Sequence, residues 1–94
     1  MPISKSLKLS INISKQGKRY VAYSPALDIA TSGKSKRDVQ SKFMELVEIF
    51  FEEIEEKGTF EQVLTDLGWK KVRNVLQPPL VSHQTMNVRI PAFA

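Results

Sequence analysis

The amino-acid sequence predicts an α+β fold. We expect an antiparallel three-stranded meander, then one long and one short helix packed on one face of the sheet, and a strand at the C-terminal end. Apolar and polar residues alternate in the first third of the chain, apolar residues recur at helical spacing in the middle, and alternation returns near the end. A chain of 94 residues has room for one hydrophobic core, so we expect a single domain over residues 1–94.

Alternating side chains predict the three strands of the meander. Residues 7–14 place leucine and isoleucine on one face and polar residues on the other, and the glycine-containing segment 15–18 is typical of a hairpin turn. Residues 19–23 are rich in aromatic and β-forming types and predict the second strand, which Pro25 ends because proline has no N–H to donate to a neighbouring strand. A third, short strand is predicted within residues 27–33.

Helical periodicity begins after Ser35, which forms a capping-box pattern with Asp38. We expect this helix to cover residues 36–57 and to end at Gly58, since glycine readily adopts the left-handed conformation that terminates helices. Its predicted inner face is an apolar stripe about 100° wide. The residues of this stripe are Val39, Phe43, Leu46, Val47, Phe50 and Ile54.

The last third of the chain starts with a second capping-box pattern, Thr59 with Gln62, ahead of a short predicted helix. Residues 69–76 fit either a strand or an extended strap, and the two prolines that follow require a non-helical path. Residues 86–90 alternate again and predict the last strand. We interpret residues 77–94 as a proline-broken strap and strand that either completes its own sheet or is exchanged between subunits.

The net charge of +4 is a sum of unlike parts. Residues 1–44 hold nine basic and two acidic side chains, residues 45–66 hold one basic and eight acidic ones, and residues 67–94 hold four basic and no acidic ones. An acidic helical block is therefore predicted between basic segments. This pattern favours docking against a basic protein, or pairing between copies, at least as well as binding to a polyanion.

Few side chains are suited to catalysis or metal binding. The chain has no cysteine and a single histidine, His83, which we place in a solvated loop, so no zinc site of familiar spacing can be built. The predicted strands offer only one carboxylate, Asp28, which we interpret as a turn residue, because the others lie mostly on the predicted helices. We expect a non-enzymatic protein with no metal and no cofactor.

The cellular location follows from what the sequence lacks. No apolar run approaches the roughly 20 residues that cross a bilayer, and the first residues do not resemble a secretory signal. The absence of cysteine favours a reducing compartment. We expect a cytoplasmic protein without a membrane partner.

The long helix has more apolar residues than a two-layer domain needs. Met44 and Phe51 flank the stripe on one side and Ile49 on the other, and they fit either a wide core face or a subunit interface. Trp69 fits either the core or an interface anchor. The predicted oligomer interface combines apolar residues of the helix and of the terminal strand: Met44, Phe51, Met86, Val88 and Ile90.

Short motifs in the centre of the chain form a recognisable order. An aromatic strand leads into Tyr23-Ser-Pro-Ala-Leu-Asp28, then into a short strand, a Gly33-Lys-Ser35 helix start and a long acidic helix. The pattern that ends in Leu67-Gly-Trp69 closes the second helix. Together these motifs, over residues 20–69, resemble the HicB family of antitoxin-like proteins.

Two features depart from that family pattern. Asp38-Val39 stands where the first helical turn usually has Glu-Ala, and the DNA-binding module frequent at the C-terminus of the family is missing from the sequence. Residues 86–91 resemble only the ribbon of such a module.

The resemblance implies a partial ribonuclease-H-like fold without the carboxylates of the nuclease. It also implies a binding role, because HicB-like antitoxins mask a small basic HicA ribonuclease toxin. We therefore expect a HicA-like toxin as partner, and a homodimer or homotetramer of this chain. The residues predicted to bind the partner lie on and after the acidic helix: Glu48, Glu52, Glu55, Glu56 and Trp69.

Other hypotheses stay open. A stand-alone oligomeric HicB-like protein would have no toxin partner and would bind nucleic acid weakly, using basic side chains against phosphates. A metal-dependent nuclease on the related fold would depend on Asp28. The basic residues predicted for nucleic-acid binding are Lys34, Lys36, Arg37, Lys42, Lys70, Lys71 and Arg73.

Overall fold

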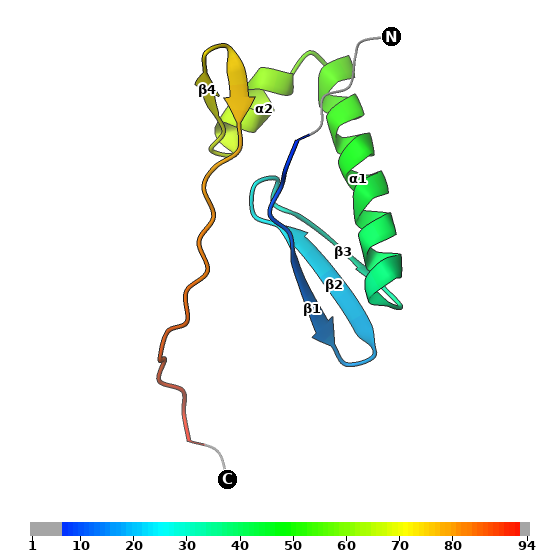
Figure 1. The fold of residues 1–94 in the computed structure, drawn as a ribbon, viewed down its shortest axis with the longest axis vertical. Helices are drawn as coiled ribbons and strands as arrows, with labels where there is room; N and C mark the ends of the chain where they lie inside the picture. The colour runs from blue at the N-terminus through cyan, green and yellow to red at the C-terminus, as the bar shows by residue number, and fades with distance from the viewer. Residues whose placement is uncertain (1–6, 93–94) are drawn as a thin grey trace.

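A long helix packs on one face of a three-stranded antiparallel sheet in the computed structural model, which describes residues 7–92 (Figure 1). A short helix, a two-stranded hairpin and an extended C-terminal segment follow. The predicted α+β class is confirmed. The elements are β1 (Asn12–Gln16), β2 (Arg19–Ser24), β3 (Ile29–Gly33), α1 (Lys36–Glu56), α2 (Phe60–Asp66), β4 (Lys70–Val72) and β5 (Val75–Gln77).

The main sheet is a meander with two tight turns. Gly17 has a φ of 64°, the left-handed conformation that the two-residue turn between β1 and β2 requires at its first position. The connection from β2 to β3 runs from Pro25 to Asp28, and the Asp28 N–H donates to the Ser24 carbonyl oxygen at 2.7 Å. Because β2 pairs with both neighbours, it is the central strand and β1 and β3 are the edges.

β1 begins later than the alternating pattern predicted, at Asn12 rather than at residue 7. Asn12 is opposite Tyr23, close to the end of β2, and the chain turns away from β1 at Pro25. A segment becomes a strand only where another strand offers hydrogen-bonding partners. Residues 7–11 therefore extend the line of β1 without a strand beside them.

The junction between β3 and α1 is fixed by one close approach and two capping hydrogen bonds. A Cβ on Gly33 would lie 2.8 Å from the Val39 nitrogen, so glycine is required there. The Ser35 hydroxyl oxygen accepts from the Asp38 N–H at 3.0 Å, as predicted for an N-cap. The Asp38 carboxylate accepts from the Lys34 N–H at 2.8 Å. In a standard capping box the donor would be the N–H of the N-cap, Ser35, one residue later. The hydrogen bond from Lys34 lowers the pKa of Asp38.

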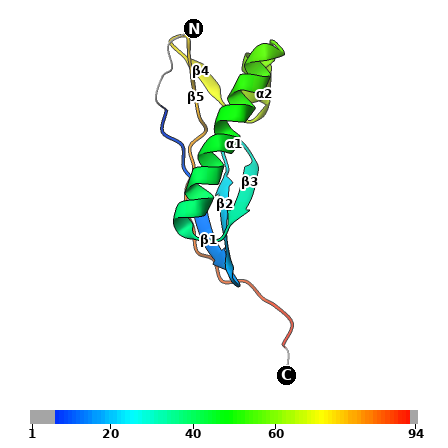
Figure 2. The same ribbon diagram turned by 90° about the vertical axis from the view of Figure 1, so that its right-hand side faces the viewer.

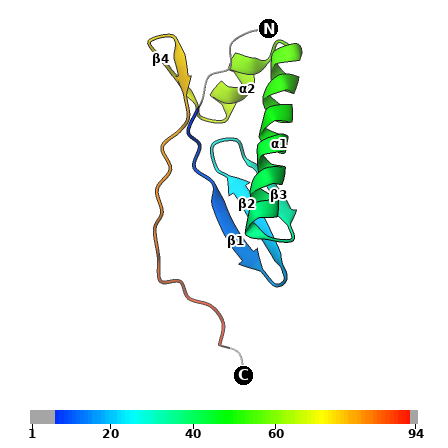
Figure 3. The same ribbon diagram turned by 45° about the vertical axis from the view of Figure 1, so that its right-hand side comes forward.

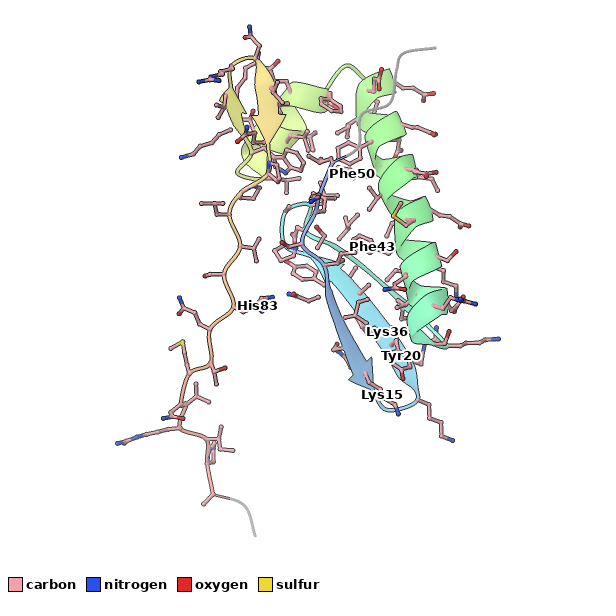
Figure 4. The ribbon with its side chains drawn as sticks, in the orientation of Figure 1. Lys15, Tyr20, Lys36, Phe43, Phe50 and His83 are labelled. Carbon is pink, nitrogen blue, oxygen red and sulfur yellow. The ribbon has the colours of Figure 1, made fainter. Side chains whose placement is uncertain are left out.

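α1 buries the face that its sequence predicted. Val39 and Phe43 pack with Ala22 of β2 in one buried cluster, and Ile54 belongs to a second cluster with Leu64 of α2. Figure 4 shows Phe43 pointing from α1 toward the sheet. The remaining stripe residues are half-buried around these two clusters: Leu46, Val47 and Phe50.

α2 starts differently from the prediction. Thr59 makes no side-chain hydrogen bond to the first turn of α2; its hydroxyl instead donates to the Ile54 carbonyl oxygen at 3.3 Å, and its N–H donates to the same oxygen at 2.9 Å. Thr59 therefore satisfies the end of α1, where carbonyl groups lack helical partners. In the part of the chain that the structure describes, neither helix has the length and apolar character that crossing a membrane would take.

Trp69 joins the C-terminal third to the core. Its side chain is 3% exposed, and the indole N–H donates to the Ala26 carbonyl oxygen at 2.9 Å. The ring lies edge-on to Phe51, with 6.4 Å between centroids, and Phe51 also contacts Phe50 and Phe60. Of the two locations predicted for Trp69, the core is the observed one.

The chain after Trp69 corrects one prediction. Most of residues 69–76 belong to the hairpin of β4 and β5, whose turn has positive φ at Arg73 and Asn74. The strand predicted over residues 86–90 does not form. Residues 78–92, which we call the arm, have no regular secondary structure and pass the sheet without joining it (Figures 1 and 2).

The arm makes the molecule long. The principal extents are 58 × 28 × 21 Å, and the radius of gyration is 16.4 Å, against about 12 Å for a compact chain of this length. Figure 3 shows the arm running in the same direction as β1, with its end beyond the turn between β1 and β2.

Candidate protein-binding surface

The face of α1 that points away from the sheet is acidic. At 100° per residue, five glutamates fall within an arc of about 100° opposite the buried residues of the helix. All five are exposed, and no other element covers this side of α1 in Figure 1. We call them the acidic stripe: Glu45, Glu48, Glu52, Glu55 and Glu56.

No ion pair within residues 7–92 neutralises the acidic stripe. The ion pairs of this part of the chain use other carboxylates: Asp38 with Lys42, Glu53 with Lys57, and Glu61 with Lys71.

The charges of the stripe repel one another. Glu48, Glu52 and Glu56 follow at four-residue spacing, where each pair of like charges destabilises a helix by about 0.2–0.5 kcal/mol. The last turn of α1 contains no basic residue, and Lys57 at the C-cap pairs with Glu53, so Glu55 and Glu56 lie at the negative end of the helix dipole without an ion pair of their own among residues 7–92. The stripe therefore lowers the stability of α1 in the free protein.

Two exposed apolar side chains flank the stripe. Met44 is 58% exposed on one side and Ile49 is 57% exposed on the other. Phe51, predicted with Met44 for an oligomer interface, is half-buried among the aromatic rings of its own core. Trp69, predicted for the partner-binding site, is buried in the same core and is not accessible to a partner.

The basic residues predicted for nucleic-acid binding do not form one surface. Those numbered 34, 36 and 37 surround the start of α1, whereas those numbered 70, 71 and 73 lie in the β4–β5 hairpin. The two groups lie at opposite ends of α1 in Figure 1, and the helix of 21 residues is about 30 Å long. Lys42 is held by Asp38 on the first turns of the helix.

The structure adds basic residues that the sequence analysis did not select. The turn between β1 and β2 reaches the end of the molecule where α1 begins, and Figure 4 shows Lys15 and Lys36 at this end. The pairing of Tyr20 with Gly33 places the backbone of Arg19 near that of Lys34, although the Arg19 side chain donates to Ser32 on the sheet face away from α1. We call this group the basic end: Lys15, Lys18, Arg19, Lys34, Lys36 and Arg37. The register of the predicted meander was the signal that could have identified it.

The apolar residues of the arm are solvent-exposed. Met86, Val88 and Ile90 are 73%, 72% and 73% exposed. They belong to neither of the two buried clusters found among residues 7–92.

Side chains with acid–base chemistry are dispersed. Asp28 accepts from the Tyr23 hydroxyl at 2.9 Å, and this hydrogen bond, with desolvation and the carboxylate charge, raises the pKa of Tyr23. His83 lies exposed on the arm (Figure 4). Between residues 7 and 92, no group of three or more histidine, aspartate or glutamate side chains is arranged to hold a metal ion.

No family model, curated protein or solved structure matches the chain. The resemblance to the HicB family stays a prediction from short motifs. A functional proposal therefore depends on the charges, exposure and contacts described above.

Proposed function

We propose that this protein is a non-enzymatic, antitoxin-like binding protein whose acidic stripe masks a small basic partner, a HicA-like RNA-cleaving toxin. The partner class comes from the HicB-like motifs, and the exposure of the acidic stripe supports its choice as the binding surface. The proposal includes a cytoplasmic location, in keeping with a chain that has no cysteine.

The uncompensated charge of the acidic stripe carries the proposal. Sequences usually satisfy local helix rules, and they break those rules mainly at functional sites. A lysine at position 52, between Glu48 and Glu56, would have formed attractive pairs at four-residue spacing and stabilised α1. A basic protein docked on the stripe would relieve this repulsion on binding, so the destabilising charges fit a surface whose counter-charges are supplied by a partner.

The surroundings of the stripe also fit a protein partner. Protein interfaces place apolar side chains beside charged ones, and the charges set the association rate and the choice of partner. Met44 and Ile49 supply exposed apolar area on both sides of the stripe. Nucleic acid would be repelled by this face, since its phosphates carry the same sign of charge.

Co-purification from the native cell tests the proposal first. A chromosomal copy with an affinity tag is expected to retain a small basic protein, encoded beside its own gene, that cleaves RNA when separated from this chain. If the purified protein carries no such companion at native expression levels, the toxin-masking proposal is wrong and the stand-alone hypothesis is favoured.

Charge-matched variants then locate the surface. Glu48→Gln/Glu52→Gln removes two charges from the stripe, and Glu53→Gln/Glu61→Gln removes two from carboxylates that are already paired within the chain. We expect the stripe variant to weaken binding by about tenfold or more, mainly through a slower association rate that depends less on salt, and the control to bind nearly as wild type. Equal losses in both variants would show that only the overall charge matters, not the stripe.

A second candidate, weak nucleic-acid binding by a stand-alone oligomer, is favoured by the basic end. Six basic residues from two segments of the chain lie at this end of the molecule. This hypothesis predicts retention on heparin and binding that falls steeply with salt. Lys15→Glu/Lys36→Glu should abolish retention, whereas Lys70→Glu/Arg73→Glu at the far hairpin should preserve most of it.

A further inference from the structure

We propose that the arm of one copy of this chain adds as an edge strand beside β1 of a second copy, so that two copies exchange arms. The receiving surface consists of β1 and residues 7–11 before it. The proposal concerns self-association and does not depend on the toxin-masking function or on the acidic stripe.

The arm has the sequence of a strand but no partner. Met86, Val88 and Ile90 alternate with Asn87 and Arg89, the pattern of a strand with one buried face. In the isolated chain these three apolar side chains are exposed, and the backbone of the arm is paired with no described strand. Exposed strand-like segments of this kind commonly add to the open edge of a sheet.

The edge of the sheet at β1 also has exposed apolar side chains and unpaired backbone. Leu7 and Ile11 are 46% and 39% exposed, and the backbone of residues 7–11 has no neighbouring strand because β2 ends at Ser24. The segment 7–13 alternates apolar and polar residues as the arm does. Two half-apolar strands side by side would cover each other's exposed apolar side chains.

The other edge of the sheet is less suitable. α1 packs mainly on β3 and β2, so β1 lies at the side of the sheet away from the helix. Neither β1 nor β3 has an exposed large apolar residue of its own, but Leu7 and Ile11 in the segment before β1 are exposed and an added strand there would cover them. β1 is therefore the edge that we assign to the arm.

Geometry favours a second copy over the arm's own sheet. The arm leaves the hairpin near the level of residues 7–11 and runs in the direction of β1 (Figures 1 and 3). Residue 86 is eight residues after Pro78, and an extended chain of that length spans about 26 Å. The apolar part of the arm thus reaches the polar end of its own β1 and continues past it, and a second copy can present residues 7–13 at that position.

The oligomeric state of the full chain tests the proposal. Light scattering during size-exclusion chromatography is expected to give a dimer, or a larger even-numbered assembly, at micromolar concentration. The triple variant M86K/V88K/I90K places lysine on the apolar face of the arm, and H83K/T85K/N87K places three lysines on the opposite face as a matched control. We expect the first variant to raise the dissociation constant by at least about a hundredfold, since it removes three buried apolar side chains, and the control to remain associated.

Each outcome bears on the proposal. A monomeric wild-type chain at about 100 μM would overturn it, because arms docked on their own sheets leave the mass unchanged. An oligomer that survives M86K/V88K/I90K, or one that both triple variants dissociate equally, would also overturn it. In circular dichroism the triple variant should keep the helical signal and its cooperative unfolding and lose only the strand signal of the docked arm, since no residue of the arm belongs to either buried cluster.

A second pair of variants identifies the receiving edge. Ile11→Lys places a charge beside the docked arm, whereas Ala30→Lys places the same charge on exposed residue 30 of β3. We expect Ile11→Lys to weaken association by at least about tenfold and Ala30→Lys to leave it unchanged. If Ala30→Lys weakened association and Ile11→Lys did not, the arm would dock at β3, and the assignment to β1 would be wrong.

Discussion

Two regions of this chain follow opposite rules although their sequence patterns are similar. In residues 12–69, each strand and helix buries its apolar face against a neighbour, in two clusters that meet under α1. In residues 86–90 of the arm, an equally regular alternation leaves its apolar side chains in solvent. An alternating pattern describes which face of a strand would be buried, but a strand forms only where a second backbone is available.

The comparison also divides the surface of α1. The inner face of the helix obeys the rules of helix packing, and the outer face breaks the rule on like charges at four-residue spacing. The inner face determines how α1 packs, and the outer face slightly lowers the stability of the helix. The following experiments are arranged from the largest expected effect on stability to the smallest.

The largest contrast is between two leucines that differ only in burial. Leu64 is 1% exposed in α2, and Leu80 is fully exposed at the root of the arm. We expect Leu64→Ala to lower the free energy of unfolding by about 2–5 kcal/mol and Leu80→Ala by less than about 0.5 kcal/mol, as measured by urea denaturation at one protein concentration. Similar losses in the two variants would contradict the division into a packed unit and a free arm.

Trp69 tests the connection between the two regions. Trp69→Phe keeps an aromatic ring but removes the donor to the Ala26 carbonyl oxygen, which is then buried without its partner. We expect a loss of about 2 kcal/mol, since an unsatisfied buried polar group costs about 1–3 kcal/mol. Far-ultraviolet circular dichroism is the suitable probe because the chain has only one tryptophan and the variant has none. An unchanged midpoint would show that the indole hydrogen bond does not anchor the hairpin.

The junction between β3 and α1 should give a pH-dependent contribution. The Lys34 N–H, with a smaller effect of Lys42, lowers the pKa of Asp38 below its ordinary value of 3.8. A group whose pKa is lower in the folded state adds stability above its unfolded pKa and loses it as the pH falls through the folded value. We expect wild type to be more stable than Asp38→Asn at neutral pH, and the difference to shrink below pH 3.8 and then disappear.

Ser35→Ala is the control for this titration. It removes the other capping interaction of the junction, at a cost of about 1 kcal/mol, but a hydroxyl does not titrate in this range. Its effect should therefore be the same at every pH at which the protein folds. If the effect of Asp38→Asn were equally independent of pH, the negative charge of the carboxylate would not contribute to stability.

The acidic stripe should give the smallest effect on stability, with the opposite sign. Glu52→Lys replaces two repulsive pairs, with Glu48 and Glu56, by attractive ones, so we expect a gain of about 0.5–1 kcal/mol in thermal or urea denaturation. The same variant should bind a basic partner more weakly. A gain in stability together with a loss of binding would distinguish a functional surface from a merely tolerated one.

Much of the packed unit could be predicted from the sequence because its signals are local. The start of α1 at Ser35, its apolar stripe and its end near Gly58 follow from capping and periodicity, and the observed helix agrees to within one residue. The acidic stripe follows in the same way, since residues at three- and four-residue spacing share a face of a helix. The meander followed from alternation, Gly17 and Pro25.

The errors occurred where the outcome depended on distant residues. Thr59 has the pattern of a cap for α2, but the end of α1 offered its hydroxyl an unsatisfied carbonyl oxygen. Phe51 and Trp69 fitted an interface as well as a core, and the ring packing of α1 with α2 decided for the core. Residues 86–90 had the pattern of a strand without a strand beside them.

The sequence by itself determined the fold class, the extent of α1, its charged outer face and the uneven distribution of charge along the chain, because each depends on residues close together in the sequence. The tertiary structure decided that Trp69 is buried, that six basic residues gather at one end, that residues 70–77 form their own hairpin and that the arm stays outside the sheet. These outcomes depend on which backbones and side chains meet in space, and contacts between distant segments are not encoded in local periodicity.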